Sequence, residues 1–317
     1  MIIRTVTEKK SYVEAEVVRL AEASPLRTRP RCPVFGSCGG CAYQHVTYDQ
    51  QLQIKADQVT DLLRRIGGFS SLDIRPTLPS PEQWDYRNRI SVHVSEGKVG
   101  FHHRKSRRLV PVSHCPIANA SVNEQLAALA QRPPSGKNRF TLRSRTDRLG
   151  FSQVNDGAAK ILLDVVAGMF GGSEDHLIDA YCGGGFFAKH LRGKFAKVTG
   201  IEWSEPAISA ARRDALESES YVQGAVEYHL ASLLNQTPSE RTALLVDPPS
   251  EGLPPDVLAA ILANPPAAFV YVSCDPATLA RDLKKLASVY QIDHVQPVDM
   301  FPQTAEIEVA SSCRLRV

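Results

Sequence analysis

Short apolar runs alternate with helix-like segments in the second half of the chain. The runs that begin at Leu177, Lys197, Ala243 and Ala268 predict buried strands. Residues 158–170 and 205–217 carry apolar side chains at helical spacing, and Pro276 suits the first position of a further helix. Because strands and helices alternate, we predict a doubly wound α/β sheet of parallel strands.

The first half shows a different pattern. Residues 12–20 and 86–112 alternate between apolar and polar positions, which predicts strands, antiparallel in the second stretch. Residues 48–66 predict a helix that ends at Gly67-Gly68, with an apolar face of Leu52, Val59, Leu62, Leu63 and Ile66. We therefore expect a short N-terminal segment (1–31), a smaller, mainly antiparallel β region (32–150) and an α/β domain (151–317). The helix at 48–66 is expected to pack on that last domain.

Charge divides the chain in the same way. Residues 1–150 hold 24 Lys and Arg against 13 Asp and Glu, a net charge of +11, whereas residues 151–317 hold 13 against 21, a net charge of −8. A basic half favours a polyanion such as RNA, and an ordinary solvated surface is the alternative. The basic residues gather at 87–108 and 132–148, and Phe101, His102 and His103 are candidates to stack on unpaired bases.

The location also follows from the sequence. No apolar stretch approaches the length of a membrane helix, and the apolar start is too short for a signal peptide. We expect a cytoplasmic protein, no membrane partner and a monomer. In that compartment the seven cysteines favour metal binding or catalysis over disulfides.

Four cysteines form a ligand pattern. Cys32, Cys38 and Cys41 have the spacing Cys-x5-Cys-x2-Cys, and Cys115 is the candidate for a fourth ligand because proline follows it, as it follows Cys32. Four thiolates suit an iron–sulfur cluster or structural zinc. Zinc ribbons usually carry two Cys-x2-Cys pairs and this chain has one, so we predict a structural 4Fe–4S cluster. Unrelated reduced cysteines are the remaining alternative.

The segment around Cys274 is the strongest candidate for catalysis. Cys274 follows a predicted strand and precedes a predicted helix, which is where open α/β sheets bind ligands. We expect the positive end of that helix to lower the thiol pKa, although a cysteine that only fills space is the alternative. Asp247-Pro-Pro ends another strand, where a strand terminator is the alternative, and Glu308 is a candidate general base.

Glycines and an acid indicate a nucleoside site. Asp179, Gly183, Gly185 and Glu202 fit a scheme in which a nucleoside approaches the backbone and an acid accepts its ribose hydroxyls. Because a full Gly-x-Gly-x-x-Gly is absent, the pattern favours S-adenosylmethionine over a dinucleotide.

These residues lie in segments that resemble the RNA uracil-5-methyltransferases, which make 5-methyluridine in transfer RNA or 23S ribosomal RNA. The matching segments keep the family's order from residue 32 to residue 308. They are 32–45, 51–55, 87–89, 100–104, 110–117, 151–155, Asp179-Ala-Tyr-Cys-Gly, Asp247-Pro-Pro, the Cys274 segment and Asp299-Met-Phe-Pro-Gln-Thr.

The resemblance implies roles for individual residues. Cys274 would be the nucleophile that adds to carbon 6 of uracil, and Glu308 the base that removes the proton from carbon 5. The target base would leave its stack. Positions that contact S-adenosylmethionine or the uracil correspond to Gln153, Tyr181, Glu202 and Asp247, and the four cysteines correspond to the family's cluster ligands.

Three positions depart from the family's pattern. Phe186 replaces an asparagine of the glycine loop, Ser250 replaces the arginine after Asp-Pro-Pro, and Asp275 replaces the asparagine after the nucleophile. Asp275 is expected to cap its helix while its charge opposes thiolate formation at Cys274. The family's RNA-binding barrel is expected to be truncated or absent before Cys32.

Together these observations predict a methyltransferase specific for carbon 5 of uridine in structured RNA. Ribosomal RNA is the first expectation and transfer RNA the second. A non-catalytic iron–sulfur protein that binds RNA is the alternative, motivated by Phe186, Ser250 and Asp275.

Overall fold

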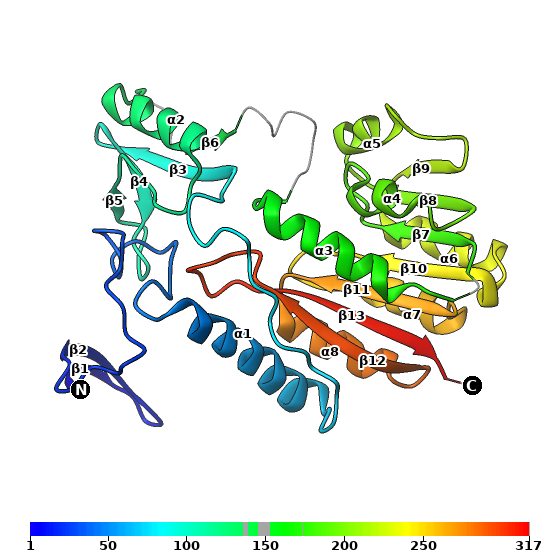
Figure 1. The fold of residues 1–317 in the computed structure, drawn as a ribbon, viewed down its shortest axis with the longest axis horizontal. Helices are drawn as coiled ribbons and strands as arrows, with labels where there is room; N and C mark the ends of the chain where they lie inside the picture. The colour runs from blue at the N-terminus through cyan, green and yellow to red at the C-terminus, as the bar shows by residue number, and fades with distance from the viewer. Residues whose placement is uncertain (136–138, 145–152, 173, 317) are drawn as a thin grey trace.

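An α/β/α sandwich forms the larger part of the molecule (Figure 1). The computed structural model describes residues 1–135, 139–144, 153–172 and 174–316. The predicted boundary between residues 150 and 151 lies outside the described residues, as do Lys137, Arg145, Arg148 and the first two residues of the segment Phe151–Asn155.

The central sheet has seven strands in the order β12-β13-β11-β10-β7-β8-β9. Their bounds are β7 His176–Ala180, β8 Lys197–Glu202, β9 Glu219–Gln223, β10 Thr242–Val246, β11 Ala268–Ser273, β12 Tyr290–Val298 and β13 Glu308–Leu315. The predicted α/β sheet is confirmed, but the prediction that all strands are parallel is wrong. β13 runs antiparallel to both β11 and β12, because a loop without a crossover helix connects β12 to β13.

Helices cover both faces of this sheet. One face packs against α3 (Asp156–Met169), α4 (Phe186–Leu191) and α5 (Glu205–Arg212). The other face packs against α6 (Val226–Gln236), α7 (Pro255–Ala263) and α8 (Pro276–Leu286). A short 3-10 turn, η2 (Ser239–Arg241), precedes β10. The helix predicted over 205–217 ends at Arg212, five residues early.

The helix predicted at 48–66 is present and joins this second layer. It consists of α1 (Tyr48–Leu62) and a π-helical turn, η1 (Leu63–Gly67). Val59 and Leu63 belong to the same core cluster as Ala280 and Leu283 of α8. Ile66, however, is exposed, and the buried positions include the polar residues Gln51 and Lys55.

The smaller region is a four-stranded antiparallel sheet in the order β5-β4-β3-β6. Its strands are β3 Arg89–Ser95, β4 Lys98–His102, β5 Leu109–Pro111 and β6 Arg139–Arg143, and helix α2 (Ala120–Gln131) packs on it. The predicted antiparallel strands between residues 86 and 112 are confirmed.

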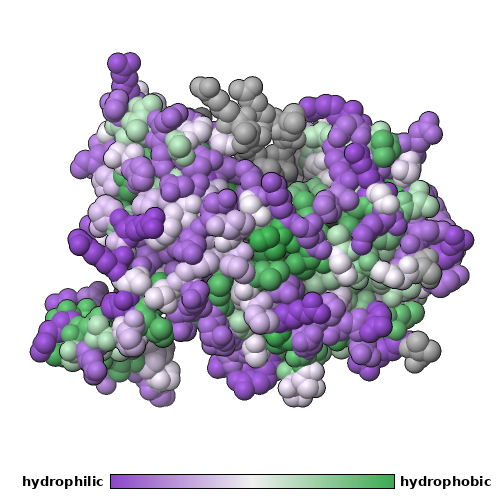
Figure 2. Space-filling view, in the orientation of Figure 1, coloured by the Kyte–Doolittle hydropathy of each residue, from purple (hydrophilic) through white to green (hydrophobic). Residues whose placement is uncertain are grey.

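The N-terminus forms a two-stranded hairpin of β1 (Ile2–Glu8) and β2 (Val13–Arg19). Figure 2 shows hydrophobic residues on its surface, and Val6, Val13, Val17 and Val18 are each more than half exposed. No described helix is long and apolar enough to span a membrane.

Candidate active site

Five neighbouring strands bring their functional residues to one edge of the sheet. Tyr181 follows β7, Asp247 follows β10 and Cys274 follows β11, while Glu202 ends β8 and Glu308 begins β13. Ile201 pairs with Ala180 and Ala180 with Val246, so Glu202, Tyr181 and Asp247 lie at one level. Because β13 is antiparallel, its first residue lies at the edge where the parallel strands end.

The strand register next to Cys274 is specific. Ser273 pairs with Val309, so Cys274 and Glu308 are the next residues on the two adjacent strands. Asp275 caps α8: its side chain accepts hydrogen bonds from the backbone N–H groups of Ala277 and Thr278, at 2.8 and 3.2 Å. Such a cap stabilises a helix by about 1 kcal/mol. The predicted capping role of Asp275 is confirmed.

The electrostatic surroundings of Cys274 oppose ionisation of its thiol. Although Cys274 is exposed, desolvation and the nearby carboxylates of Glu308, Asp247 and Asp275 raise the pKa of its thiol. The prediction that the pKa of this thiol is lowered is wrong, because desolvation and the nearby acids outweigh the helix N-terminus. The opposing effect predicted for Asp275 is confirmed.

The two carboxyls beside Cys274 share the same negative surroundings. Burial raises the pKa of Asp247 to about 7. Burial raises the pKa of Glu308 well above its ordinary value, and the charges of Asp247 and Glu306 raise it further. Two carboxyls this close resist double ionisation, so near neutral pH the pair retains a proton. A group that holds and releases a proton near pH 7 suits acid–base catalysis.

The neighbouring end of the edge can hold a nucleoside. Glu202 accepts hydrogen bonds from the N–H groups of Gly183 (3.2 Å) and Ser204 (2.8 Å), which fixes its carboxylate beside the glycine loop. Gly183 and Gly185 have φ angles of +54° and +84°, which glycine adopts without strain. Tyr181 has φ +66°, an uncommon value for a residue with a side chain and one often found at functional sites.

Two further predicted site residues, Asp179 and Gln153, are buried. Asp179 is fully buried and accepts a hydrogen bond from the N–H of Ala188, so it orients the start of α4 from below the loop. Gln153 is buried, and its backbone carbonyl accepts a hydrogen bond of 2.8 Å from the side-chain amide of Asn88. This contact connects the segment before α3 to the smaller region. Phe186 packs against Phe187 with ring centroids 4.8 Å apart, where an asparagine would present an amide.

Comparison with known proteins agrees with this geometry. Residues 232–313 match the family described as tRNA (uracil-5-)-methyltransferase. An uncharacterized RNA methyltransferase of Halalkalibacterium halodurans is 32% identical, over 99% of this chain and 89% of the relative, and one of Synechocystis is 30% identical, over 97% and 87%.

The chain belongs to the RNA uracil-5-methyltransferase family. A solved structure supports the fold of this methyltransferase over nearly its whole length. The Pyrococcus abyssi tRNA (uracil-54, C5)-methyltransferase in complex with S-adenosyl-L-homocysteine is 23% identical, with a TM-score of 0.73, over 98% of this chain and 92% of that one. The family prediction is confirmed, and so is the prediction of an enzyme.

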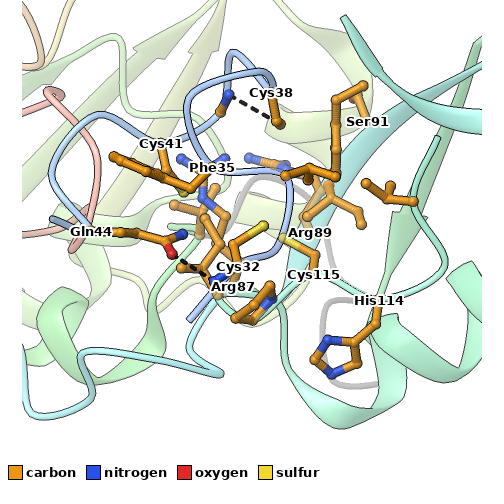
Figure 3. A pocket seen from close by; sticks show the side chains of 18 residues that line it. Cys32, Phe35, Cys38, Cys41, Gln44, Arg87, Arg89, Ser91, His114 and Cys115 are labelled. Carbon is orange, nitrogen blue, oxygen red and sulfur yellow. Dashed lines mark hydrogen bonds between the residues drawn. The ribbon is translucent and has the colours of Figure 1, made fainter. Parts of the chain in front are cut away.

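In this methyltransferase the four predicted cysteine ligands line one cavity of about 290 Å3 (Figure 3). All four are free thiols and only partly exposed. Burial and the charges of the other three cysteines together raise the pKa of Cys41 to about 12, and burial likewise raises the pKa of Cys38 and Cys115. Such thiols become thiolates only beside a cation, which is the state that a metal ligand requires.

The thiols do not form a closed metal site. Among the described residues, no three His, Cys, Asp or Glu side chains stand together as a metal-ligating group. The donor set nevertheless fits an iron–sulfur cluster in number and type, since four thiols from two segments face one cavity.

The basic surface of the methyltransferase adjoins the cysteines. Arg104, Lys105, Arg107 and Arg108 are exposed on the loop between β4 and β5. Backbone hydrogen bonds from Gly39 to His102 and from Arg104 to Ser37 join this loop to the cysteine segment.

Two of the aromatic residues predicted to stack on RNA bases pack against other side chains of the protein. Phe101 packs against the core of the smaller region, and His102 packs against His93 with ring centroids 3.8 Å apart. Both rings therefore have intramolecular partners, and their contact with RNA bases stays a prediction.

Sequence reasoning assigned no individual role to three residues next to the site. Gln303 lies in the β12–β13 loop that leads to Glu308, and Gln51 and Lys55 of α1 donate hydrogen bonds to that loop. Arg87, predicted with the basic residues to contact RNA, pairs with Glu306 of the same loop. The sequence indicated the first three residues in two ways: residues 51–55 and 299–304 lie in segments that match the family, and Gln51 and Lys55 occupy the core-facing stripe of an amphipathic helix, four residues apart.

Proposed function

We propose that this methyltransferase transfers a methyl group from S-adenosylmethionine to carbon 5 of a uridine in structured RNA. The observation that carries the proposal is the strand register, which sets Cys274 beside Glu308, with Asp247, Tyr181 and Glu202 along the same edge. Ribosomal RNA is the first candidate substrate and transfer RNA the second. A cytoplasmic location is part of the proposal because seven free cysteines suit a reducing compartment.

In the proposed reaction Cys274 acts first. Its thiolate forms a bond to carbon 6 of the uracil, and the electron pair of the 5,6 double bond moves to the oxygen on carbon 4. Bound S-adenosylmethionine supplies an electrophilic methyl group, which carbon 5 takes as the sulfur–methyl bond breaks. Glu308 then removes the proton from carbon 5, and the bond between carbon 6 and Cys274 breaks, releasing the thiolate.

The side chains around this pair bind and orient the reactants. Glu202 is proposed to accept the ribose hydroxyls, with Gly183 and Gly185 allowing close approach of the nucleoside to the backbone. Tyr181, Gln153 and Asp247 are proposed to contact S-adenosylmethionine or the uracil. The exposed position of Cys274 fits a target base that swings out of its stack to reach the thiol.

A covalent trap tests the proposed reaction. The protein is mixed with S-adenosylmethionine and with ribosomal or transfer RNA transcribed with 5-fluorouridine. Since fluorine on carbon 5 cannot leave as a proton, we expect a denaturation-resistant complex that Cys274→Ala abolishes. No complex with either RNA, together with no rise in melting temperature on adding S-adenosylmethionine, would refute the enzyme and favour the RNA-binding alternative.

We also propose that Cys32, Cys38, Cys41 and Cys115 hold a structural 4Fe–4S cluster. What supports it is the set of four reduced thiols around one cavity, together with the raised pKa values of Cys38, Cys41 and Cys115, which favour thiolates only beside a cation. Protein purified without oxygen should be brown and contain about four iron and four sulfide per chain, as the cluster formula requires. Stoichiometric zinc without sulfide would instead identify a zinc site.

A further inference from the structure

The loop between β12 and β13, residues 299–307, leads directly to Glu308. It contains no strand or helix, yet Asp299, Met300, Pro302, Gln303 and Thr304 are buried. A buried loop needs partners for its backbone polar groups. Those partners come from α1, from the cysteine segment and from Leu78, Tyr86 and Asn155, so distant parts of the chain determine the path of the loop.

Lys55 joins the two ends of this loop. Its ammonium group donates to the carboxylate of Asp299 at 2.6 Å, to the carbonyl of Phe301 at 3.1 Å and to the carbonyl of Glu306 at 2.8 Å. The side chains of Lys55 and Asp299 are both completely buried. An ammonium group has three donors, and all three are used on the loop. The last of these contacts lies two residues before Glu308.

Gln51 holds the middle of the loop. Its side chain and Gln303 exchange two hydrogen bonds of 3.0 Å, and Gln303 has φ +71°, an uncommon value for a residue with a side chain. The carbonyl of Gln303 accepts hydrogen bonds from the N–H groups of Ala42 and Tyr43. Gln51 and Lys55 are one helical turn apart, so a single face of α1 holds both the bend and the ends of the loop.

Stability alone does not account for this arrangement. Apolar side chains at two core-facing positions would pack as well, because a buried ion pair is often no more stabilising than hydrophobic residues of similar size. The polar groups instead determine the conformation of the loop. The Lys55 ammonium and the Gln51 amide form directional hydrogen bonds with a loop that no strand pairing holds. A base displaced by about 1 Å loses rate on the order of a hundredfold.

We propose that Lys55 and Gln51 are positioning residues that hold the β12–β13 loop so that Glu308 can take the proton from carbon 5. The inference rests on the proposed function and deepens it. The two residues do not touch the reacting atoms. Their loss therefore slows the step that follows methyl transfer and leaves the addition of Cys274 and the binding of RNA in place.

The test uses ribosomal or transfer RNA transcribed with ordinary uridine, S-adenosylmethionine and the full-length chain. Lys55→Met and, as a milder change, Gln51→Met should lower kcat about 10- to 100-fold. KM for RNA should fall in proportion, with kcat/KM nearly unchanged, because only a step after methyl transfer slows. Both should accumulate a covalent complex with unmodified uridine RNA, which is also the result we expect for Glu308→Gln. Retention of wild-type kcat without such a complex would overturn the proposal.

A double variant separates positioning from stability. Lys55→Met leaves the Asp299 carboxylate buried without a partner, which is strongly destabilising, and adding Asp299→Asn removes that charge. We expect Lys55→Met/Asp299→Asn to regain melting temperature but still accumulate the complex. Recovery of both stability and turnover would show a merely structural role and would overturn the proposal.

Arg192→Met is the matched control. Arg192 pairs at 3.2 Å with the buried carboxylate of Glu219, which begins β9 at the opposite end of the strands from Cys274. It should lower stability without accumulating the complex. If wild-type protein forms no complex with 5-fluorouridine RNA, the proposed function itself fails. If it does form one while Lys55→Met turns over normally, only the positioning role fails.

Discussion

Asp247 offers a direct test of the charge balance at the carboxyl edge of the sheet. Its pKa is raised by burial from 3.8 to about 7. Between pH 3.8 and about pH 7, Asp247 keeps a proton in the folded chain that it has lost in the unfolded chain. The resulting stabilisation is complete below the unfolded pKa and is lost as the pH rises through 7. Asp247→Asn removes the ionisation while keeping the size of the side chain.

The expected magnitude follows from the pKa difference. At 1.36 kcal/mol per unit, the 3.2 units between 3.8 and about 7 correspond to about 4 kcal/mol in total. Roughly 3 kcal/mol of this falls between pH 5 and pH 8. Asp247 remains partly exposed, so this figure is an upper limit. We expect the free energy of unfolding of Asp247→Asn, relative to the parent protein, to increase by up to that amount from pH 5 to pH 8.

Urea unfolding followed by tryptophan fluorescence at pH 5, 6, 7 and 8 measures this difference. Glu124→Gln, which removes an exposed carboxylate on α2, is the control and should show no comparable trend. The Asp247 charge also raises the pKa of Glu308. Asp247→Asn should therefore make the stability of the variant still less dependent on pH, which increases its difference from the parent protein in the same direction. A constant difference between Asp247→Asn and the parent protein across this range would refute the raised pKa.

Other predictions concern the thiols and the basic loop. The rate at which iodoacetamide alkylates Cys274, followed by mass spectrometry as a function of pH, should have its midpoint above the ordinary thiol pKa. Glu308→Gln should lower the pH of that midpoint, because it removes a nearby carboxylate. An unchanged midpoint would contradict the effect of the carboxylate. Cys41→Ser should lower bound iron to well under half of the parent's content, whereas Cys313→Ser, at a buried thiol far from the cavity, should retain it; equal iron in both would exclude Cys41 as a ligand. Replacing Arg104, Lys105, Arg107 and Arg108 by Gln should reduce the slope of log affinity for RNA against log salt by about 3, at roughly 0.7 to 0.9 per phosphate contact. An unchanged slope would place the RNA elsewhere.

Local patterns in the sequence were sufficient to predict most elements. The apolar runs ending at Glu202, Asp247 and Cys274 are buried strands in the structure, because central parallel strands are covered on both faces and contain few polar residues. The amphipathic spacing also identified α1 and α3. These features depend on neighbours close in the chain, which sequence periodicity records.

The direction of β13 was not predictable in the same way. A short apolar strand has the same pattern whether it runs parallel or antiparallel. Only the loop that returns β13 beside β11 brings Glu308 to the edge that carries Cys274. The pKa of Cys274 also depended on the fold, since Asp247 and Glu308 are separated from it in sequence by 27 and 34 residues.

The sequence by itself determined the family, the order of the α/β elements and the residue types available for chemistry, because motifs and periodicities are local properties. Tertiary structure alone decided which of these residues meet. It brought four thiols from two segments around one cavity, set the carboxyls of Asp247 and Glu308 beside Cys274, and turned Gln51 and Lys55 toward the loop before Glu308. The physical reason is that charge and hydrogen bonding act over a few ångströms in space, whatever the separation along the chain.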